Sequence, residues 1–532
     1  MTTEHVAADF PVAWEDPAEA ELSWEFDGMH HPTALSPLAG DYFRVIGQGL
    51  GYRYQRLGLP VEMLVRVWNG YAYLAARVTP PPGETEEEFG RRATEARRER
   101  IPVTAAYWRD EAMPALRAGY DWFRALPVEA MPAGDLAATW ESAWQRIEKA
   151  WRIHFYAIIG PYRVLDDLAD AYEEAMPDAN PADALTLIQG RATELAAVED
   201  DIDALGSLAG ELPDVAAALR DGRPLPASAS GEGFREALAA FLERHGHLGQ
   251  SYDDLALPSW VEEPQLLLTQ VALRLGRRSE ATNRRAGMQA EAEQRVAAVR
   301  ERLAGEPDKV DHFEWLLRHA LDIGPLTERH NYWIDRMAQS TLRRFCPRVG
   351  ARLAREGVLA DAADVLFLRR DETPALIRRP TSMLRDVAER RALHERQRAM
   401  KPPPYVGKAP EAGRNRFDPF VHESAGTAEL RGVGASSGVA RGPARIVFTP
   451  ADFARVRPGD VVVGPSSNPS WLPLFTIVAG LVTDTGGVLS HAAVVAREFA
   501  LPAVVGTGNA TERIPDGRMV ELDGATGFVR LL

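Results

Sequence analysis

The sequence predicts a protein of two unlike parts, a mainly α-helical region over residues 1–400 and a compact α/β domain over residues 432–532. Before residue 400, apolar residues recur at three- and four-residue spacing, which is the period of an amphipathic helix. After residue 431, short β-forming runs alternate with helical segments. Residues 401–431 are rich in proline and glycine with little periodicity, so we expect a linker between the two parts.

The helical region is divided by prolines and contains one expected extended segment. Trp68, Tyr71 and Tyr73 are β-formers, so residues 65–75 are predicted to be extended. Helices are predicted where Ala, Leu, Glu and Arg dominate, at residues 181–205, 234–245, 265–303, 310–321 and 325–355.

The α/β domain is predicted from shorter runs. Strands are expected at residues 444–448, 460–463, 480–483, 503–505, 519–522 and 527–531. Helices are expected at residues 471–479 and 490–499, the second beginning after a glycine pair.

Composition and charge exclude several classes of protein. The chain of 532 residues has 76 acidic and 61 basic residues, a net charge of −15, and such a chain repels nucleic acid. The sequence contains no run of about 18 apolar residues, so it predicts no membrane-spanning helix. The first residues of the sequence do not contain a basic segment followed by an apolar one, so no signal peptide is predicted there. The single Cys346 cannot form an internal disulfide. We therefore expect a cytoplasmic protein without nucleic-acid or membrane partners.

The strongest chemical signal is a turn that ends in a histidine, Thr485-Gly486-Gly487-Val488-Leu489-Ser490-His491. The glycine pair allows a tight turn, and Ser490 is a good N-cap that places His491 in the first helical turn. Helical N–H groups and the helix dipole stabilise an anion there, and a neutral imidazole is a nucleophile toward phosphorus. The turn therefore suits a histidine that carries a phosphoryl group. A capping or core histidine is the open alternative.

Residues 430–532 resemble the phosphohistidine swivelling domain of the phosphoenolpyruvate (PEP)-utilising enzymes, which include PEP synthase, rifampicin phosphotransferase and phenylphosphate synthase. The resemblance covers Gly434–Gly442, Asn468–Trp471, Thr485–Glu498 and Pro502–Gly506. It implies that His491 is the phosphorylated histidine. Leu489 stands where the dikinases carry a regulatory threonine, which implies that this control is absent. The residues expected to form the phosphate-stabilising turn are Thr485, Gly486, Gly487, Ser490 and Arg497.

The helical region resembles the same family more weakly. Phe26–Leu38 is similar to the segment that follows the ATP-grasp domain in rifampicin phosphotransferase-like proteins. His245–Gly249 is similar to their Gly-His-Arg-Gly segment, with Leu248 in place of the arginine, and Gly357–Leu368 is similar to the end of their substrate-binding domain. The resemblance implies that residues 1–400 bind the phosphoryl acceptor.

Two parts of the family pattern are not found. No Gly-x-x-x-x-Gly-Lys-Ser/Thr phosphate loop occurs, and only 25 residues precede Phe26, where the family has its ATP-grasp domain. We therefore expect a separate ATP-grasp subunit to bind ATP and Mg²⁺ and to phosphorylate this chain, as the resemblance to phenylphosphate synthase implies. No metal site is expected in the chain itself.

Several further residues are candidates for the acceptor site. His247 is a possible general base because histidine titrates near neutrality, and a histidine bonded to backbone is the alternative. Asp253 and Asp254 are a possible base or metal ligand, with turn capping as the default. Glu199–Asp201 is expected to be a solvated helix face. The candidates for the acceptor pocket are His31, Trp68, Tyr71 and Tyr73, with an exposed His30–His31 pair and core aromatics as alternatives.

The function that these features predict is that of a phosphotransferase subunit. It would relay a phosphoryl group through His491 from the ATP-grasp subunit to a small hydroxyl acceptor, with a phenol or aromatic alcohol favoured. Two alternatives stay open: a subunit that phosphorylates the hydroxyl of an antibiotic or another drug, and a phosphocarrier or regulatory protein that is not an enzyme.

Overall fold

The computed structural model describes residues 10–532 apart from residues 29, 180, 192, 250–254, 277–280, 409–428, 449, 467–470, 476 and 488–489. The chain divides into two compact units, each built from separate stretches of sequence. The first contains Met1–Arg163, Tyr252–Pro258 and His330–Pro410, and the second contains Val164–Ser251, Ser259–Arg329 and Glu411–Leu532. The predicted boundaries at residues 400 and 432 stay a prediction. None of the described helices combines the length and the apolar character that a membrane span requires.

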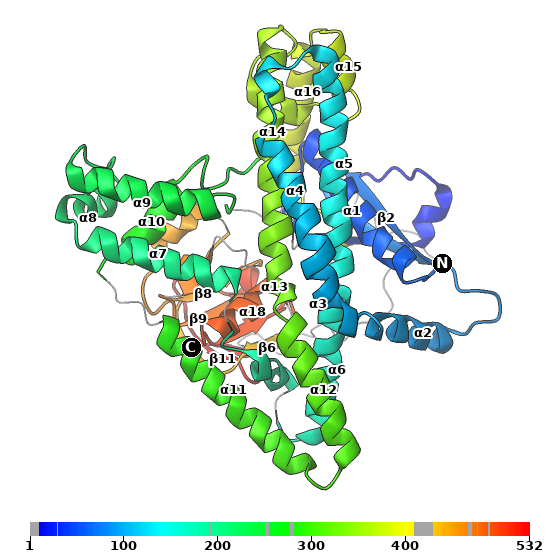
Figure 1. Ribbon diagram of the computed structural model, residues 1–532, viewed down its shortest axis with the longest axis vertical. Coiled ribbons are helices and arrows are strands. Elements are labelled where there is room, and N and C mark those ends of the chain that lie inside the picture. Colours follow the sequence, from blue (N-terminus) through cyan, green and yellow to red (C-terminus); the bar gives the residue numbers. More distant parts are fainter. Residues whose placement is uncertain are drawn as a thin grey trace. The chain divides into compact units, whose positions relative to one another are not determined.

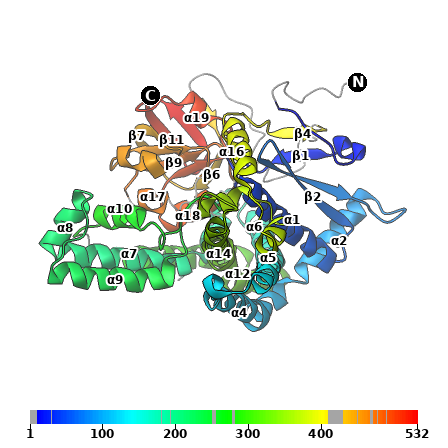
Figure 2. The ribbon, with the colours of Figure 1, turned by 90° about the horizontal axis from the view of Figure 1, so that it is seen from above.

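Long helices form most of the first unit. Figure 1 shows α5 (Ala133–Ala157), α14 (Met337–Arg355) and α4 (Met113–Arg124) lengthwise, and Figure 2 shows them end-on. The first of these buries Trp140, Trp144 and Trp151, and it packs against α1 (Pro37–Arg56). The unit also contains η1 (Pro17–Glu21), α2 (Glu86–Arg98), η2 (Ile101–Val103), α3 (Thr104–Tyr107), η3 (Trp108–Ala112), η4 (Val128–Ala130), η6 (Asn331–Arg336), η7 (Ala362–Phe367), α15 (Thr373–Arg378) and α16 (Leu384–Arg398).

A four-stranded antiparallel sheet completes the first unit, in the order β2-β3-β1-β4. Its strands are β1 (Ser23–Phe26), β2 (Val61–Trp68), β3 (Tyr71–Val78) and β4 (Tyr405–Gly407). The single extended segment predicted at residues 65–75 is therefore wrong, because a hairpin turns at Asn69 and Gly70. Both residues have positive φ, 52° and 81°, and an Asn-Gly pair favours this kind of tight turn. The strand β4 also lies inside the segment predicted as a linker.

Helices and a sheet share the second unit. Its helical part contains η5 (Pro181–Ile188), α7 (Glu194–Gly210), α8 (Pro213–Arg220), α9 (Ala229–His245), α10 (Gln265–Leu273), α11 (Ala281–Leu303) and α12 (Pro307–Ile323). The helices α6 (Ile159–Ala175) and α13 (Leu326–His330) cross the division between the units. The predicted single helix at residues 181–205 is wrong, because Gly190 adopts φ of 78° between η5 and α7. The predicted helix at residues 265–303 is likewise two helices.

An eight-stranded sheet forms the C-terminal part of the second unit, in the order β5-β12-β11-β7-β8-β9-β10-β6. The four strands from β7 to β10 run parallel, and the outer strands pair antiparallel. The strands are β5 (Glu429–Arg431), β6 (Val433–Ser436), β7 (Val439–Ile446), β8 (Val461–Gly464), β9 (Gly480–Thr483), β10 (Ala503–Val505), β11 (Met519–Asp523) and β12 (Phe528–Leu531). The predicted alternation of strands and helices after residue 431 is confirmed.

Each face of this sheet buries its own apolar cluster. One cluster joins β8, β9 and β10 to α17 (Leu472–Phe475) and α18 (His491–Glu498). The other includes Ala510, the first residue of α19 (Ala510–Arg513), and Ile514, the residue after that helix. Figure 2 shows α17 and α18 on one side of the sheet and α19 on the other. The segment η8 (Pro450–Arg455) follows β7. The sheet is therefore covered on both faces, as parallel strands require.

Candidate functional site

The loop from β9 to α18 has the geometry of a glycine turn that leads into a capped helix. Gly486 has φ of 115°, which side chains rarely adopt, and a Cβ there would lie 2.8 Å from Ser490 Oγ. The Ser490 N–H donates to Gly487 O over 2.9 Å, and the Ser490 hydroxyl accepts from the Ala493 N–H at 3.4 Å. The helix begins with His491, at the end where N–H groups lack helical partners. Nothing is described of the His491 side chain itself.

Backbone and side-chain bonds fix this loop to the sheet. The Thr485 N–H and the Thr485 hydroxyl both donate to Pro465 O, each over 2.9 Å. The Thr483 hydroxyl donates to Thr485 O over 2.7 Å. Because the Thr485 hydroxyl gives its proton to backbone, it holds the loop in place. Its predicted contact with phosphate stays a prediction.

A buried carboxyl group that the sequence reasoning did not single out supports the same loop. Asp484 follows β9 directly, and its side chain accepts the Thr511 N–H at 2.9 Å and the Thr511 hydroxyl. Burial raises the pKa of Asp484 above its ordinary value, although these hydrogen bonds oppose the shift. The Gly508 N–H donates to Asp484 O over 2.8 Å. Asp484 therefore ties the start of the turn to α19.

The structure does not bring Arg497 to this turn. Arg497 lies in the last turn of α18, six residues after His491, or about 9 Å along the helix axis at 1.5 Å per residue. Its guanidinium is buried and donates to Ala435 O over 2.9 Å. In this arrangement Arg497 joins α18 to β6.

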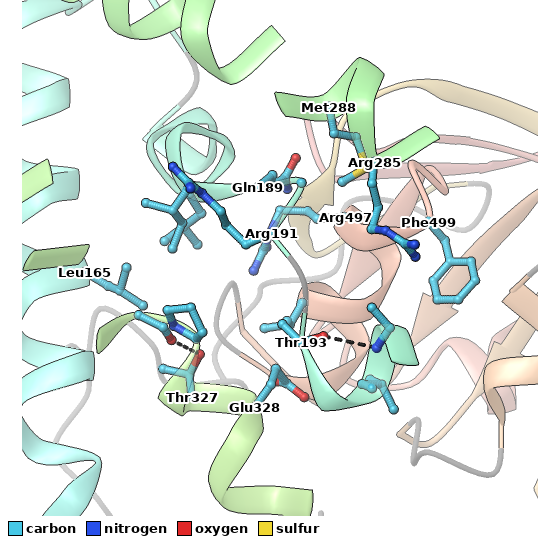
Figure 3. Close-up of a pocket in the computed structure, with 18 of the residues that line it drawn as sticks. Leu165, Gln189, Arg191, Thr193, Arg285, Met288, Thr327, Glu328, Arg497 and Phe499 are labelled. Atoms are coloured by element: carbon cyan, nitrogen blue, oxygen red, sulfur yellow. Dashed lines mark hydrogen bonds between the residues drawn. The ribbon is translucent and has the colours of Figure 1, made fainter. Parts of the chain in front are cut away.

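A cavity of about 110 Å³ lies in the second unit beside α18. Val494, Arg497 and Phe499 line it from α18 and the residue after it, and Val494 is one helical turn beyond His491. Figure 3 shows the other walls, which come from the segment around η5 and α7, from α11 and from the residues around Thr327 and Glu328. The cavity therefore joins the helix that begins at His491 to the helical part of the same unit.

The lining combines apolar side chains with charged side chains of both signs. The apolar residues include Leu165, Leu185, Ile188, Met288 and Phe499, and the charged ones include Arg191, Arg285, Glu199 and Glu328. Arg285 donates twice to Asp200, over 2.7 and 3.1 Å, and Arg191 is exposed. Glu199 is buried and lies 2.5 Å from Arg274. The solvated acidic face predicted at Glu199–Asp201 is therefore wrong at Glu199, because this carboxylate pairs with a buried arginine.

The aromatic candidates for an acceptor pocket lie instead in the core of the small sheet. Trp68, Tyr71 and Tyr73 are buried together with Trp24 and Val406. The Tyr71 hydroxyl donates to Gln397 O or Met400 O over 3.0 or 2.8 Å, and the Tyr73 hydroxyl donates to Pro403 O over 2.8 Å. Since their polar groups meet the chain's own backbone, these aromatics have the contacts of core residues.

The histidine candidates lie in different places. His30 is exposed, with its Nδ1 2.6 Å from Asp27 Oδ1, whereas His31 is buried against Phe43. The expectation of an exposed His30–His31 pair is therefore wrong for His31. His247 is buried in a segment whose backbone bonds to residues 260 and 261, and it is not among the residues that line the cavity. Asp253 and Asp254 lie outside the described residues.

The sequence reasoning missed two groups of residues. Arg285 and Met288 line the cavity from a helix with no motif. His154, His330 and Asp335 form a buried cluster in the first unit. No local signal marks these residues: Arg285 and Met288 lie on one helix without a motif, and the cluster joins His154 to residues far along the chain.

Comparison with known proteins places these features in a family. Residues 456–527 match the profile of the PEP-utilising enzyme mobile domain, and residues 154–328 match that of the rifampicin phosphotransferase fourth domain. Both matches support a relation to the PEP-utilising enzymes. Within that family it is similar to the rifampicin phosphotransferases. The cavity lies between the two matched regions, since its helical walls fall in the second and its α18 wall in the first.

Three relatives illustrate the similarity. The chain is 29% identical to chondramide synthase of Chondromyces crocatus, over 98% of this chain and 14% of that protein. It is 27% identical to the uncharacterised phosphotransferase YvkC of Bacillus subtilis, over 74% of this chain and 50% of that protein. It is 31% identical to rifampicin phosphotransferase of Streptomyces sviceus, over 71% of this chain and 44% of that protein. The matched part of the chain thus spans half or less of the length of these relatives.

Proposed function

We propose that this chain is a phosphotransferase component that relays a phosphoryl group through His491 to a small acceptor hydroxyl. The observation that carries the proposal is the turn from Gly486 to Ser490, which places His491 at the start of α18. An imidazole nitrogen of His491 attacks the phosphorus of the donor, so a P–N bond forms as a P–O bond breaks. The helix N-terminus then stabilises the added negative charge. In the second transfer the acceptor oxygen displaces the imidazole.

The donor site belongs to a separate ATP-grasp subunit that binds ATP and Mg²⁺. Half or more of each of the three relatives lies outside the matched part, and a donor domain there would share one polypeptide with the carrier, whereas the proposal for this chain places the donor on a partner. A histidine carrier lets two distant sites share one phosphoryl group, and each site need only position it and stabilise its charge. The domain from about residue 432 onward moves between the two sites, because His491 must reach each in turn.

The cavity beside α18 receives the acceptor. Its apolar walls suit a ring or an alkyl group, and Arg191 offers positive charge for the transferred phosphoryl. Arg285 would have to leave its pairing with Asp200 to do the same. Its volume of about 110 Å³ is well below the ~300–1,000 Å³ that drug-sized ligands occupy. The size therefore favours a single-ring acceptor such as a phenol or an aromatic alcohol.

The names of the relatives favour a second candidate, an antibiotic hydroxyl. A rifampicin phosphotransferase is named for a drug far larger than one ring, so this acceptor requires the cavity to open around part of the molecule. A phosphocarrier that is not an enzyme would accept the phosphoryl group on His491 and pass it to no small molecule.

The experiment combines the chain, a candidate ATP-grasp subunit, β-labelled ATP and acceptors of both classes. We expect acid-labile label on the chain only when the partner is present, and labelled product with one acceptor class. Met288→Trp fills the cavity and should stop product formation while His491 is still labelled; Gln294→Trp, at an exposed position of the same helix, is the matched control. Failure of wild-type chain to take label, with a partner active toward a known substrate, would refute the relay. Label without product from any acceptor favours the pure carrier.

A further inference from the structure

Three side chains of the kinds that bind metal ions meet inside the first unit. His154 lies in the last turn of α5, His330 ends α13, and Asp335 lies in η6. One ligand atom from each of the three lies within 4.8 Å of the others. His154 Nδ1 is 2.6 Å from Asp335 Oδ1, and the rings of His154 and His330 meet edge to face with centroids 4.5 Å apart. Each of the three residues is more than nine-tenths buried.

A local irregularity of the helix brings two of these residues together. His330 and Asp335 are five residues apart, which places them about 140° apart around an α-helix of 3.6 residues per turn. The segment Asn331–Arg336 is a π-helix, whose hydrogen bonds join residues five apart and so bring such a pair to one face. Short π-helical turns occur frequently at functional sites. The backbone is thus shaped in a way that presents His330 and Asp335 toward the same place.

The charge around the cluster suits a cation. The carboxylate side chain of Asp335 supplies an anionic ligand, and His154 and His330 supply nitrogen donors. His30 lies near enough to Asp335 to act on it electrostatically, and His30 Nδ1 is 2.6 Å from Asp27 Oδ1. Burial lowers the pKa of His31, the residue after His30, to about 4, so its imidazole is uncharged at neutral pH. Neither His31 ring nitrogen has a hydrogen-bond partner in the described part of the chain.

We propose that His154, His330 and Asp335 bind a divalent transition-metal ion, with Zn²⁺ the best match. Two imidazole nitrogens and one carboxylate oxygen form a donor set that zinc uses in catalytic sites, where a fourth position stays open. A water molecule or an acceptor hydroxyl would complete the coordination. The acceptor hydroxyl is a candidate only if the proposed function holds. The competing explanation is a buried imidazole–carboxylate hydrogen bond that only stabilises the fold.

The test is a metal titration of the untagged full chain after treatment with a chelator, without ATP, partner or acceptor. Co²⁺ should bind with a stoichiometry of one and give visible absorption bands that Zn²⁺ then abolishes. His330→Ala and Asp335→Ala should each weaken binding at least tenfold. His312→Ala removes an exposed histidine outside the cluster and should change nothing.

A second measurement guards against variants that fail to fold. Saturating Zn²⁺ should raise the unfolding temperature of the wild-type chain but not that of His330→Gln, whose metal-free circular dichroism should match the wild type. Absence of saturable Co²⁺ and Zn²⁺ binding, or binding that survives both alanine variants, would overturn the metal site. Because no phosphoryl transfer enters the titration, that result would leave the relay through His491 untouched.

Discussion

The turn before α18 should not tolerate a side chain at residue 486. In Gly486→Ala the alanine must adopt φ of 115°, which a residue with a side chain rarely does. Its Cβ would also lie 2.8 Å from Ser490 Oγ, closer than real Cβ contacts allow. The backbone strain costs about 1–3 kcal/mol. The Ser490 hydroxyl must also move, and its cap bond is already long at 3.4 Å, so its loss adds only about 0.5–1 kcal/mol. Local destabilisation of about 2–4 kcal/mol is therefore expected.

Hydrogen exchange of the α18 amides measures this effect where it occurs. The N–H groups of Ala493 and Val494, which bond to Ser490, should exchange about 30- to 1,000-fold faster in Gly486→Ala if they exchange by local opening. Label uptake at His491 should fall in parallel. Gly517→Ala is the matched control, because Gly517 has φ of 80° but a Cβ there meets nothing within 4 Å.

Ser490→Ala separates the two contributions. It removes the cap and leaves the backbone of the turn alone, so it should reproduce only the smaller part of the effect. Exchange and labelling in Gly486→Ala within twofold of wild type would refute the reasoning. The position of His491 would then not depend on the glycine turn.

Three further predictions concern the carrier, its movement and the buried imidazole. His491→Ala should abolish acid-labile labelling while circular dichroism stays unchanged, because a residue in the first helical turn contributes little packing. In the double variant Asp183→Cys/Ser437→Cys, oxidation should form a disulfide at a side-chain contact that measures 3.5 Å in the second unit. Because the disulfide holds the domain that must move, overall turnover should stop until a thiol is added. The native Cys346 is buried and should not interfere. His31 stays neutral down to about pH 4 when folded but protonates near 6.5 when unfolded, so stability falls as pH drops through this window, by up to about 3 kcal/mol. Urea midpoints at pH 7 and pH 5 should show a smaller difference in His31→Leu.

The strands of the α/β domain could be predicted because each is a short apolar run beside a turn. Residues 480–483 and 503–505 were predicted with the observed limits. The strands β5 and β6 were missed, since they are short, flank Gly432 and occupy the edges of the sheet. The hairpin at Asn69 and Gly70 carried a usable signal, the Asn-Gly pair between two β-forming runs.

The two candidate sites differ in how far the sequence could reach them. The turn at Gly486–His491 is local, so the chemistry of its residues predicts the capped helix that the structure contains. The cavity beside α18 depends on tertiary packing of five segments between residues 165 and 499, which no periodicity reports. The cluster of His154, His330 and Asp335 depends on a π-helical turn, and the spacing of five residues argues against a shared face in an ordinary helix.

One helix serves both features of the proposed relay. The helix α18 begins at His491 and, one turn later, contributes Val494 to the wall of the cavity. Because that wall belongs to the domain proposed to move, the cavity is complete only while this domain rests against η5 and α7. An acceptor that binds the complete cavity must therefore stabilise the docked arrangement by its own binding free energy. The contact of this domain with η5 and α7 would thus have two effects. It would bring a phosphorylated His491 toward the acceptor, and it would allow the acceptor to bind only in the docked arrangement.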